Sequence, residues 1–469
     1  MIFNRSYFKL AAAALVFSGI ISCKKSEDNS VTPTNNTAVE LSGDLSTQTL
    51  DASKKYLLKG YVFVRSGQVL SIPAGTLIMG DKATKGTLVI DKGGRIEAVG
   101  TVDKPIIFTS ENDPGERDKG DWGGIILLGN ANVNQINPAI EGVNPAVTYG
   151  TNNSTANDGE SSGTLKYVRI EFAGIALSPN NEINGLTMGG VGNGTVIENV
   201  QVSFSGDDGF EWFGGTVNCK NLVSLGAWDD DFDTDFGFTG QIQFAVSVRD
   251  PYSADQSGSN GFESDNDAGG STNLPLTAPV FSNVSLFGPR FDSTTAISGN
   301  YQHAAHIRRR SAISIVNSVI TGFPTGIRLD GKTTFDNFNA GTGMLANNVL
   351  ISLGNRTAPK PFMGSGTADV ADTTVRNYYK ANNPSGYFVK SNTDFAALGI
   401  DLNLYYGKMT PYTANPVFSV TSGIITTGSS FAAARLSAGF FTPVPYIGAF
   451  NGTDWTNGWA NFDPKNTSY

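Results

Sequence analysis

The chain has 469 residues, of which 55 are Gly and only 6 are Met, and its formal net charge at pH 7 is −9. This acidic balance argues against nucleic acid as a partner, because phosphate contacts need a basic surface. No long stretch repeats its apolar residues every 3.6 positions, so composition and pattern favour an all-β domain with many turns over a helical or doubly wound one.

Residues 1–23 have the pattern of a secretory signal peptide. Arg5 and Lys9 precede an apolar run that is too short to span a bilayer. The run closes on Ile-Ile-Ser followed by Cys23, which resembles the lipobox of bacterial lipoproteins. That resemblance implies that Cys23 becomes the lipidated first residue of the mature chain.

The segment after Cys23 predicts where the protein is carried. Lys24–Asp28 resembles the charged export signal of Bacteroidetes-type surface lipoproteins, so we expect an outer-membrane lipoprotein displayed at the cell surface, with the periplasmic face as the alternative. Residues 24–40 are rich in Ser, Thr, Asn and Pro and predict a flexible tether. Loss of the signal peptide removes two basic residues and takes the formal charge from −9 to −11. With Cys23 lipidated, Cys219 has no disulfide partner.

From about Leu41 the chain breaks into short β-like runs separated by Gly and Pro turns. The first of these runs are 56–64, 68–72, 76–79, 87–90, 95–99 and 105–108. Later runs, most of which open with Asn, begin at Tyr167, Asn199, Asn221, Asn283, Asn317 and Asn348. We interpret these Asn residues as an internal ladder of stacked side chains.

A repeat of 22 residues is visible when Asn199–Glu211 is set above Asn221–Asp233. Asn falls on Asn, Asp-Asp on Asp-Asp, and Phe-Glu on Phe-Asp. A fixed period with alternating apolar residues is what one coil of a parallel β-solenoid needs. We therefore predict a parallel β-helix over residues 41–355, with about 22 residues in each coil.

Two stretches carry a family resemblance. Gly100–Ser110, followed by Asp121-Trp122-Gly123-Gly124-Ile125, is similar to the pectin-lyase-like right-handed β-helix proteins that are common on Bacteroidetes cell surfaces. The resemblance covers most of residues 41–355 and implies a single-stranded right-handed parallel β-helix. It also implies, as family context, work beside a TonB-dependent transporter of the outer membrane.

Residues 356–469 predict C-terminal coils and a cap folded back on the helix, because an open end would expose strand edges and core. Trp455 and Trp459 are four residues apart near the end of this region. We interpret them as part of the core of the cap, with a sugar-stacking platform as the alternative.

Extending the alignment forward predicts columns of side chains that run from coil to coil, since alternate residues of a strand face opposite ways. The inward column is Leu186, Phe210, Phe232, Phe262, Ile307 and Ile327. The outward column beside it is Thr187, Glu211, Asp233, Glu263, Arg308 and Arg328. Two residues further on, the same face carries Phe213, Asp235, Asp265, Arg310 and Asp330.

This charged face has three interpretations. It is a charge ladder in which arginines offset the repulsion between carboxylates at the coil spacing of about 4.8 Å. Alternatively, it is a Ca²⁺ site, for which the predicted ligands are Asp229, Asp231, Asp233 and Asp235. The spacing is not that of an EF-hand, because the twelfth position is Ile242.

The third interpretation is catalytic and comes from the resemblance. In pectate-lyase-like enzymes an Arg acts as base beside Ca²⁺ bound by carboxylates, which implies Arg308 or Arg328 as the base here. The implied metal ligands are Asp233, Asp235, Glu263 and Asp265. His303 and His306 are predicted to lie in a solvated loop.

We therefore hold three functional hypotheses. The first is a non-catalytic surface lipoprotein that binds a glycan or a partner protein. The second is a Ca²⁺-dependent polysaccharide lyase or another carbohydrate-active enzyme, and the third is a structural or adhesive stalk. The predicted binding residues are Glu211, Asp233, Asp235, Glu263, Asp265, Arg308, Arg310 and Trp228.

Overall fold

The computed structural model describes residues 38–141, 143–178, 181–292, 294–351, 360–366, 369–383, 387–388, 401, 404, 416, 418, 423–437 and 439–469. These residues belong to one compact unit, Ala38–Tyr469. The predicted signal peptide, Cys23 and nearly all of the predicted tether lie outside the described residues. Strand β1 (Val39–Leu45) already begins within the segment that we expected to be tether. Among the described residues, no helix has the length and apolarity needed to cross a membrane.

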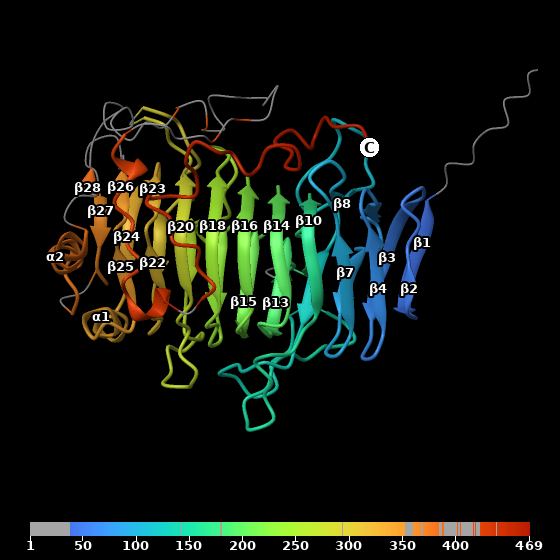
Figure 1. Ribbon diagram of the computed structural model, residues 1–469, viewed down its shortest axis with the longest axis horizontal. Helices are drawn as coiled ribbons and strands as arrows, with labels where there is room; N and C mark the ends of the chain where they lie inside the picture. The colour runs from blue at the N-terminus through green and yellow to red at the C-terminus, as the bar shows by residue number, and fades with distance from the viewer. Residues whose placement is uncertain are drawn as a thin grey trace, which may run out of the picture. The chain divides into compact units, whose positions relative to one another are not determined.

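The chain winds into coils whose strands stack into three parallel sheets (Figure 1). Sheet 1 contains the second half of β3 (Lys55–Val64), then β6 (Thr87–Ile90), β9 (Gly124–Leu128), β13 (Leu186–Val191), β15 (Phe210–Gly215), β17 (Phe232–Asp235), β19 (Phe262–Ser264), β21 (His303–Ile307), β24 (Thr325–Leu329) and β27 (Lys360–Met363).

Sheet 2 contains β2 (Gln48–Thr49), β4 (Val69–Pro73), β7 (Arg95–Val99), the first halves of β10 (Gly163–Glu171), β14 (Val196–Ser203), β16 (Asn218–Leu225), β18 (Gln241–Val248) and β20 (Val280–Phe287), and then β22 (Ser314–Val316) and β25 (Met344–Ala346). Sheet 3 contains the first halves of β1 and β3, β5 (Leu77–Gly80), β8 (Ile106–Ser110), the second halves of β10, β14, β16, β18 and β20, and then β23 (Val319–Thr321), β26 (Val349–Ile351) and β28 (Tyr387–Phe388). The second half of β1 pairs with β3 in sheet 1. A small antiparallel pair, β11 (Ala176–Ser178) with β12 (Asn181–Glu182), stands apart from them. The fold is thus the predicted right-handed parallel β-helix.

The corner between sheets 2 and 3 explains most of the repeated Asn residues. The corner positions have positive φ: Tyr167, Asn199, Asn221, Phe244, Asn283, Asn317 and Asn347. Asn tolerates the left-handed region better than most residues, so it suits a sharp bend that each coil must repeat. Among the described residues the expected ladder is confined to the last coils, where Asn348 Oδ1 accepts from the Ser318 N–H and Asn383 Oδ1 accepts from the Asn348 N–H. Asn283 and Asn317 instead donate to the carbonyls of Tyr446 and Ser430 in the C-terminal segment.

The corner gives a test of this backbone argument at Asn221, where φ is +58°. Replacement by Val should lower the free energy of unfolding by about 1–2 kcal/mol, because a β-branched residue is strained in the left-handed region. Replacement by Gly, which adopts positive φ freely, should change it by much less. Urea unfolding of the two variants measures the difference, and equal losses would contradict a conformational role for the corner residue.

The core lies between the three sheets and contains most of the predicted inward column. Phe210, Phe232 and Phe262 are fully buried, and their rings follow one another with centroids 5.9 and 5.4 Å apart. The registers place Leu186 opposite Phe210 and Phe232 opposite Phe262, as the repeat predicts. The alternation of apolar and polar residues in the sequence therefore predicts which side chains of these strands point into the core.

The last coil is covered by a helix that lies within residues 356–469, the region predicted to contain the cap. Helix α1 (Lys332–Asn339) precedes β25, and α2 (Asp372–Asn382) packs on β25 and β27 through Val375 and Tyr379 (Figure 1). The short 3₁₀ helix η3 (Ile424–Thr426) and residues 446–462 lie along the outward face of sheet 3, whereas η4 (Ala434–Leu436) packs on Val280 and Val316 of sheet 2. The chain does fold back as expected, but along the side of the helix.

The two C-terminal tryptophans belong to the core, as predicted. Trp459 is 1% exposed, and Trp455 stacks on Phe450 with ring centroids 5.0 Å apart. Both indole N–H groups donate to backbone carbonyls of the same segment. Trp459 is therefore not available as a sugar-stacking platform, and Trp455, which is partly buried, has its ring stacked on Phe450.

Candidate functional site

The outward face of sheet 1 changes character along the helix. The strand registers align one outward position across nine coils, in the order Val89, Ile126, Thr187, Glu211, Asp233, Glu263, His306, Arg328 and Met363. The column is apolar at first, acidic in the middle and basic towards the end. We call the part from Thr187 to Arg328 the polar face.

The apolar part of this column is covered by the insertion at residues 130–160. Val133, Ile140 and Tyr149 of the insertion pack with Val89 and Ile126 in one buried cluster. The Tyr149 ring also lies 5.8 Å from that of Phe213, at the border of the acidic part. The insertion therefore ends where the polar face begins.

A second column lies three residues upstream of the first. It contains Asn184, Asp208, Asp230, Asn260 and His303, and each of these is 6% exposed or less. Asn184 Nδ2 donates to Thr187 and to Glu211, which ties the two columns together. Carboxylates of adjacent coils thus meet in a two-column grid.

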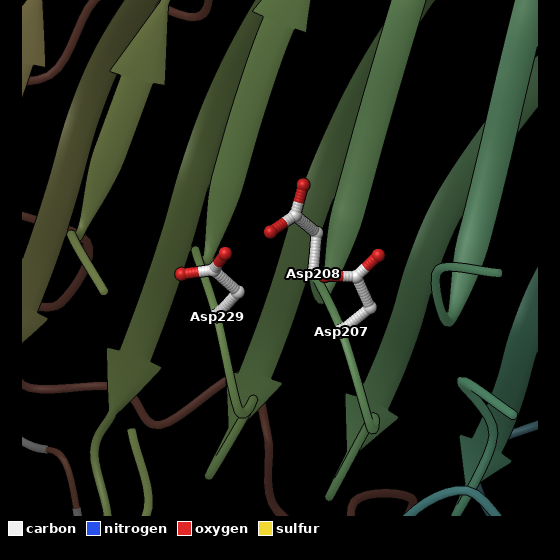
Figure 2. A group of neighbouring side chains, drawn as sticks. All are labelled: Asp207, Asp208 and Asp229. Carbon is white, nitrogen blue, oxygen red and sulfur yellow. The ribbon is translucent and has the colours of Figure 1, made fainter. Parts of the chain in front are cut away.

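Three groups of carboxylates in this grid have oxygen atoms within 4.8 Å of one another. They are Asp207, Asp208 and Asp229; Asp208, Glu211 and Asp233; and Asp230, Asp233 and Glu263. Figure 2 shows the first group: Asp207 and Asp208 come from the turn before β15 and Asp229 from the equivalent turn before β17. Asp208 and Asp233 each belong to two groups, so the three groups form one continuous row.

The negative charge of the row exceeds the positive charge of the side chains beside it. Burial, and then neighbouring carboxylates, raise the pKa of Asp208, of Glu211 and of Asp233 well above the usual range. Among the ion pairs of the described residues, none reaches these three side chains. Since like charges at this spacing repel, the carboxyl groups require protons or a cation between them.

Three oxygen atoms at the row are buried without a hydrogen bond. They are Asp233 Oδ1, Asn184 Oδ1 and, in the first group, Asp229 Oδ1. The Asn184 side chain lies against Glu211. Buried acceptors without a donor are costly. Carboxylate and amide oxygens are also the ligands that Ca²⁺ prefers, so the donor set around Asp208, Glu211 and Asp233 fits a calcium ion.

The arginines at the basic end are engaged by carboxylates. Arg308 Nε donates to both Asp265 oxygens at 2.9 and 3.1 Å, and its Nη2 contacts Glu263. Arg328 Nη2 lies 2.8 Å from Asp330 Oδ2. Burial opposes the charge of Arg308, but the Glu263 and Asp265 carboxylates raise its pKa. Both predicted catalytic bases are therefore paired with carboxylates.

The register corrects the predicted column at β21. Phe262 and Glu263 pair with Ala305 and His306, not with Ile307 and Arg308. The inward position opposite Phe262 suits the small Ala305 because the Phe281 ring already fills that space, 5.0 Å from the ring of Phe262. The insertion at 289–305 hides this two-residue shift from a sequence alignment.

The same shift moves the two predicted arginines. Arg308 lies with Asp265 in the column two residues further on, where Asp330 follows it in the next coil. Arg310 lies beyond the end of β21, and its backbone N–H donates to Thr334 Oγ1. It is therefore not a member of the column in which we expected it.

The prediction of a solvated loop for the two histidines is wrong. His303 and His306 lie on β21, are 5% and 6% exposed, and have ring centroids 4.8 Å apart. His306 Nε2 is 3.4 Å from Asp330 Oδ2, and its Nδ1 is 3.8 Å from Glu263 Oε2. Burial, and then Arg308 and other cations, lower the pKa of His306 to about 3, so its ring is neutral at pH 7.

The structure divides the predicted calcium ligands. Asp229 and Asp233 lie in the carboxylate row, whereas Asp231 points into the core, where Ser224, Ser247 and Arg249 contact it. Asp235 accepts from the Phe236 N–H and is in none of the three groups. Asp207, Asp208 and Asp230, which belong to the same acid-rich stretch of the sequence, also take part, and so does Glu211, which was predicted as a binding residue.

Trp228 lies at the edge of the row, directly before Asp229. It is half-buried, and Lys119 Nζ lies 4.8 Å from the centroid of its ring. Its carbonyl accepts from Ser259 Oγ and from the Asp255 N–H. The ring is thus fixed beside the first carboxylate group.

One comparison with known proteins finds a match. Residues 43–393, more than half of the chain, match the family model described as the pectate-lyase-like beta helix domain. No curated protein and no solved structure matches the chain. The three parallel sheets agree with the family match, and the chain belongs to the pectate-lyase-like β-helix domain family.

Proposed function

We propose that the polar face of sheet 1 holds Ca²⁺ and binds a glycan through the ion and the polar side chains around it, without catalysis. One observation carries the proposal: at the centre of the continuous row, Asp208, Glu211 and Asp233 have no cationic partner among the ion pairs of the described residues. Such a row is costly unless a cation lies in it.

Asp208, Glu211 and Asp233, with Asn184 Oδ1, would hold the ion. Ca²⁺ takes six to eight oxygen ligands, more than these side chains supply. The remaining positions suit hydroxyl groups of a sugar. Glu211 and Asp233 are partly exposed, so a ligand can reach this side of the row.

The side chains beside the row favour a glycan over a purely structural role. The polar face continues with a neutral, a basic and an acidic side chain, which are His306, Arg328 and Asp330. Arg328 and Asp330 are partly exposed to solvent, whereas His306 is buried. Fixed hydrogen-bonding groups of several kinds are what polar ligands need for orientation. A stalk needs no such row, and its repulsion would only destabilise the coils.

Binding is favoured over a lyase reaction because both candidate bases are paired. A base must accept a proton from the substrate, and Arg308 and Arg328 each contact a carboxylate that stabilises the protonated guanidinium. A lyase therefore remains the second candidate, on the family likeness alone.

We also propose where the protein acts. Lipidation of Cys23 would attach it to the outer membrane, with the β-helix at the cell surface and a TonB-dependent transporter as a neighbour. The lipobox-like residues before Cys23 support this placement.

A glycan array tests the proposed function. The purified protein should bind glycans in Ca²⁺ and lose binding in a chelator, and Glu211→Gln should lower affinity at least tenfold, because it removes a ligand of the ion. Asp44→Asn, an acid-to-amide change on β1, is the matched control and should bind as the wild type. Binding that is unaffected by the chelator would refute the role of Ca²⁺, and unsaturated products from a polyuronate would establish the lyase instead.

A further inference from the structure

The outward face of sheet 3 alternates between apolar and polar stretches along the helix. One outward position aligns Leu77, Ile107, Arg169, Gln201, Val223, Val246, Ser285, Val319 and Val349. Val223, Val246 and Val319 are at most 1% exposed, although they point away from the core. Another part of the chain must therefore cover them.

That cover is the C-terminal segment 439–469, which we call the strap. Its apolar side chains Ile447, Phe450 and Trp459 belong to one buried cluster with Val223 and Val246. In Figure 1 the red C-terminal chain passes along the stacked strands towards the first coils. The strap thus crosses many coils at right angles to the winding of the chain.

Side-chain amides of the sheets hold the strap by its backbone. Gln201 Nε2 donates to the Asn461 carbonyl at 2.7 Å, and its Oε1 accepts from the Asn461 N–H at 2.8 Å. Gln243 makes the same pair of bonds with Thr442, both at 2.8 Å. Both glutamines are fully buried, so each amide is satisfied only by the strap and its neighbours.

The end of the strap is fixed on the first coils. Arg117 Nη1 donates to the carbonyls of Pro464 and Thr467 at 2.9 and 2.8 Å. Tyr469 donates its hydroxyl to Glu171, which is fully buried. Lys55 on β3 reaches the Tyr469 carbonyl oxygen at 2.8 Å.

These contacts change how the solenoid can unfold. A coil of a solenoid touches only its neighbours, so its stability is a sum of local terms and its ends can open separately. The strap bonds to β3, β10, β14, β18 and β20 at once. Opening an early coil therefore also costs the contacts that the strap makes further along.

We infer that the strap is a longitudinal tie that makes the β-helix unfold as one cooperative unit. The inference rests on the contacts of the strap with sheets 2 and 3 and does not depend on the proposed function. It assigns a role to the C-terminal segment that an end cap could not have, because an end cap stabilises only the last coil.

Hydrogen exchange of the full chain in rising urea, followed by mass spectrometry, tests the tie. In the wild type, peptides from β5–β8 and from β23–β26 should become exposed at the same urea concentration. In the double variant Gln201→Leu/Gln243→Leu the backbone amides of the strap should lose protection from hydrogen exchange. At the urea concentration of the wild-type unfolding midpoint, the amides of β5–β8 should then exchange at least tenfold faster than those of β23–β26. Gln68→Leu, whose amide bonds Thr47, is the matched control and should keep a single transition.

A single, milder substitution tests the same inference if the double variant does not fold. Tyr469→Phe keeps the ring and removes only the hydroxyl bonded to Glu171, so it should raise exchange of the strap end and of β5–β8 but not of β23–β26. Separate transitions in the wild type, or a single transition in variants whose strap has lost protection, would overturn the inference.

Discussion

Replacing Arg249 by Met should lower the free energy of unfolding by about 3–5 kcal/mol, because it leaves a buried carboxylate without its counter-charge. Arg249 and Asp231 have no exposed side-chain surface, and Nη1 lies 3.2 Å from Oδ1. Burial raises the pKa of Asp231 even with Arg249 in place. Without the arginine the group must take up a proton or remain a costly buried charge. Urea unfolding at pH 7 measures the loss.

Two further variants separate the charge effect from lost packing. The double variant Arg249→Met/Asp231→Leu removes both charges and should recover most of the stability. Lys332→Met breaks an exposed pair with Asp336 and should cost about 0.5 kcal/mol or less. An Arg249→Met variant that loses no more than Lys332→Met would show that the buried pair does not stabilise the coil.

The 22-residue period of the sequence predicts the winding of the chain, because each coil needs an apolar residue at the same inward position and a residue that tolerates positive φ at the same corner. Phe210 and Phe232 occupy one inward position 22 residues apart, and the corner takes Asn at positions 199 and 221. The course of the C-terminal segment could not be predicted in this way. Its anchors, such as Gln201 with Asn461, join residues that no local pattern connects.

A signal for the strap was nevertheless present. Strands such as Leu222–Leu225 have apolar residues at both inward and outward positions, and that pattern predicts burial on both faces of a sheet. Sheet 3 meets this condition only because another segment covers it. An apolar outward face therefore predicts a cover, although not which segment supplies it.

The candidate site was predictable where strands follow without insertions. Glu211 and Asp233 are paired as expected, since 22 residues separate them. The insertion at 289–305 then displaces the alignment by two residues, which moves Arg308 out of the column and brings His306 into it. Asp231 was misassigned because it precedes β17, where the turn and not strand alternation decides which way a side chain points.

Addition of Ca²⁺ at about 100 times its dissociation constant should raise the free energy of unfolding by about 2.7 kcal/mol. Asp233 shares two of the three carboxylate groups, so Asp233→Asn should remove this response. In a chelator the same variant should be more stable than the wild type by about 1 kcal/mol or more, because it removes one of several repelling carboxylates. Thermal unfolding with and without Ca²⁺ measures both effects.

The folding stability should depend on pH because the pKa values of Asp208, Glu211 and Asp233 are raised in the folded chain. In the metal-free protein the folded chain retains protons that the unfolded chain loses above about pH 4, so stability falls as the pH rises towards the folded-state pKa values. Because Ca²⁺ replaces those protons, its stabilising effect should grow over the same range. A Ca²⁺ response that does not depend on pH, or that survives in Asp233→Asn, would place the ion away from this row. Only a Ca²⁺ response that grows with pH and is lost in Asp233→Asn identifies the carboxylates of sheet 1 as the ligands of the ion.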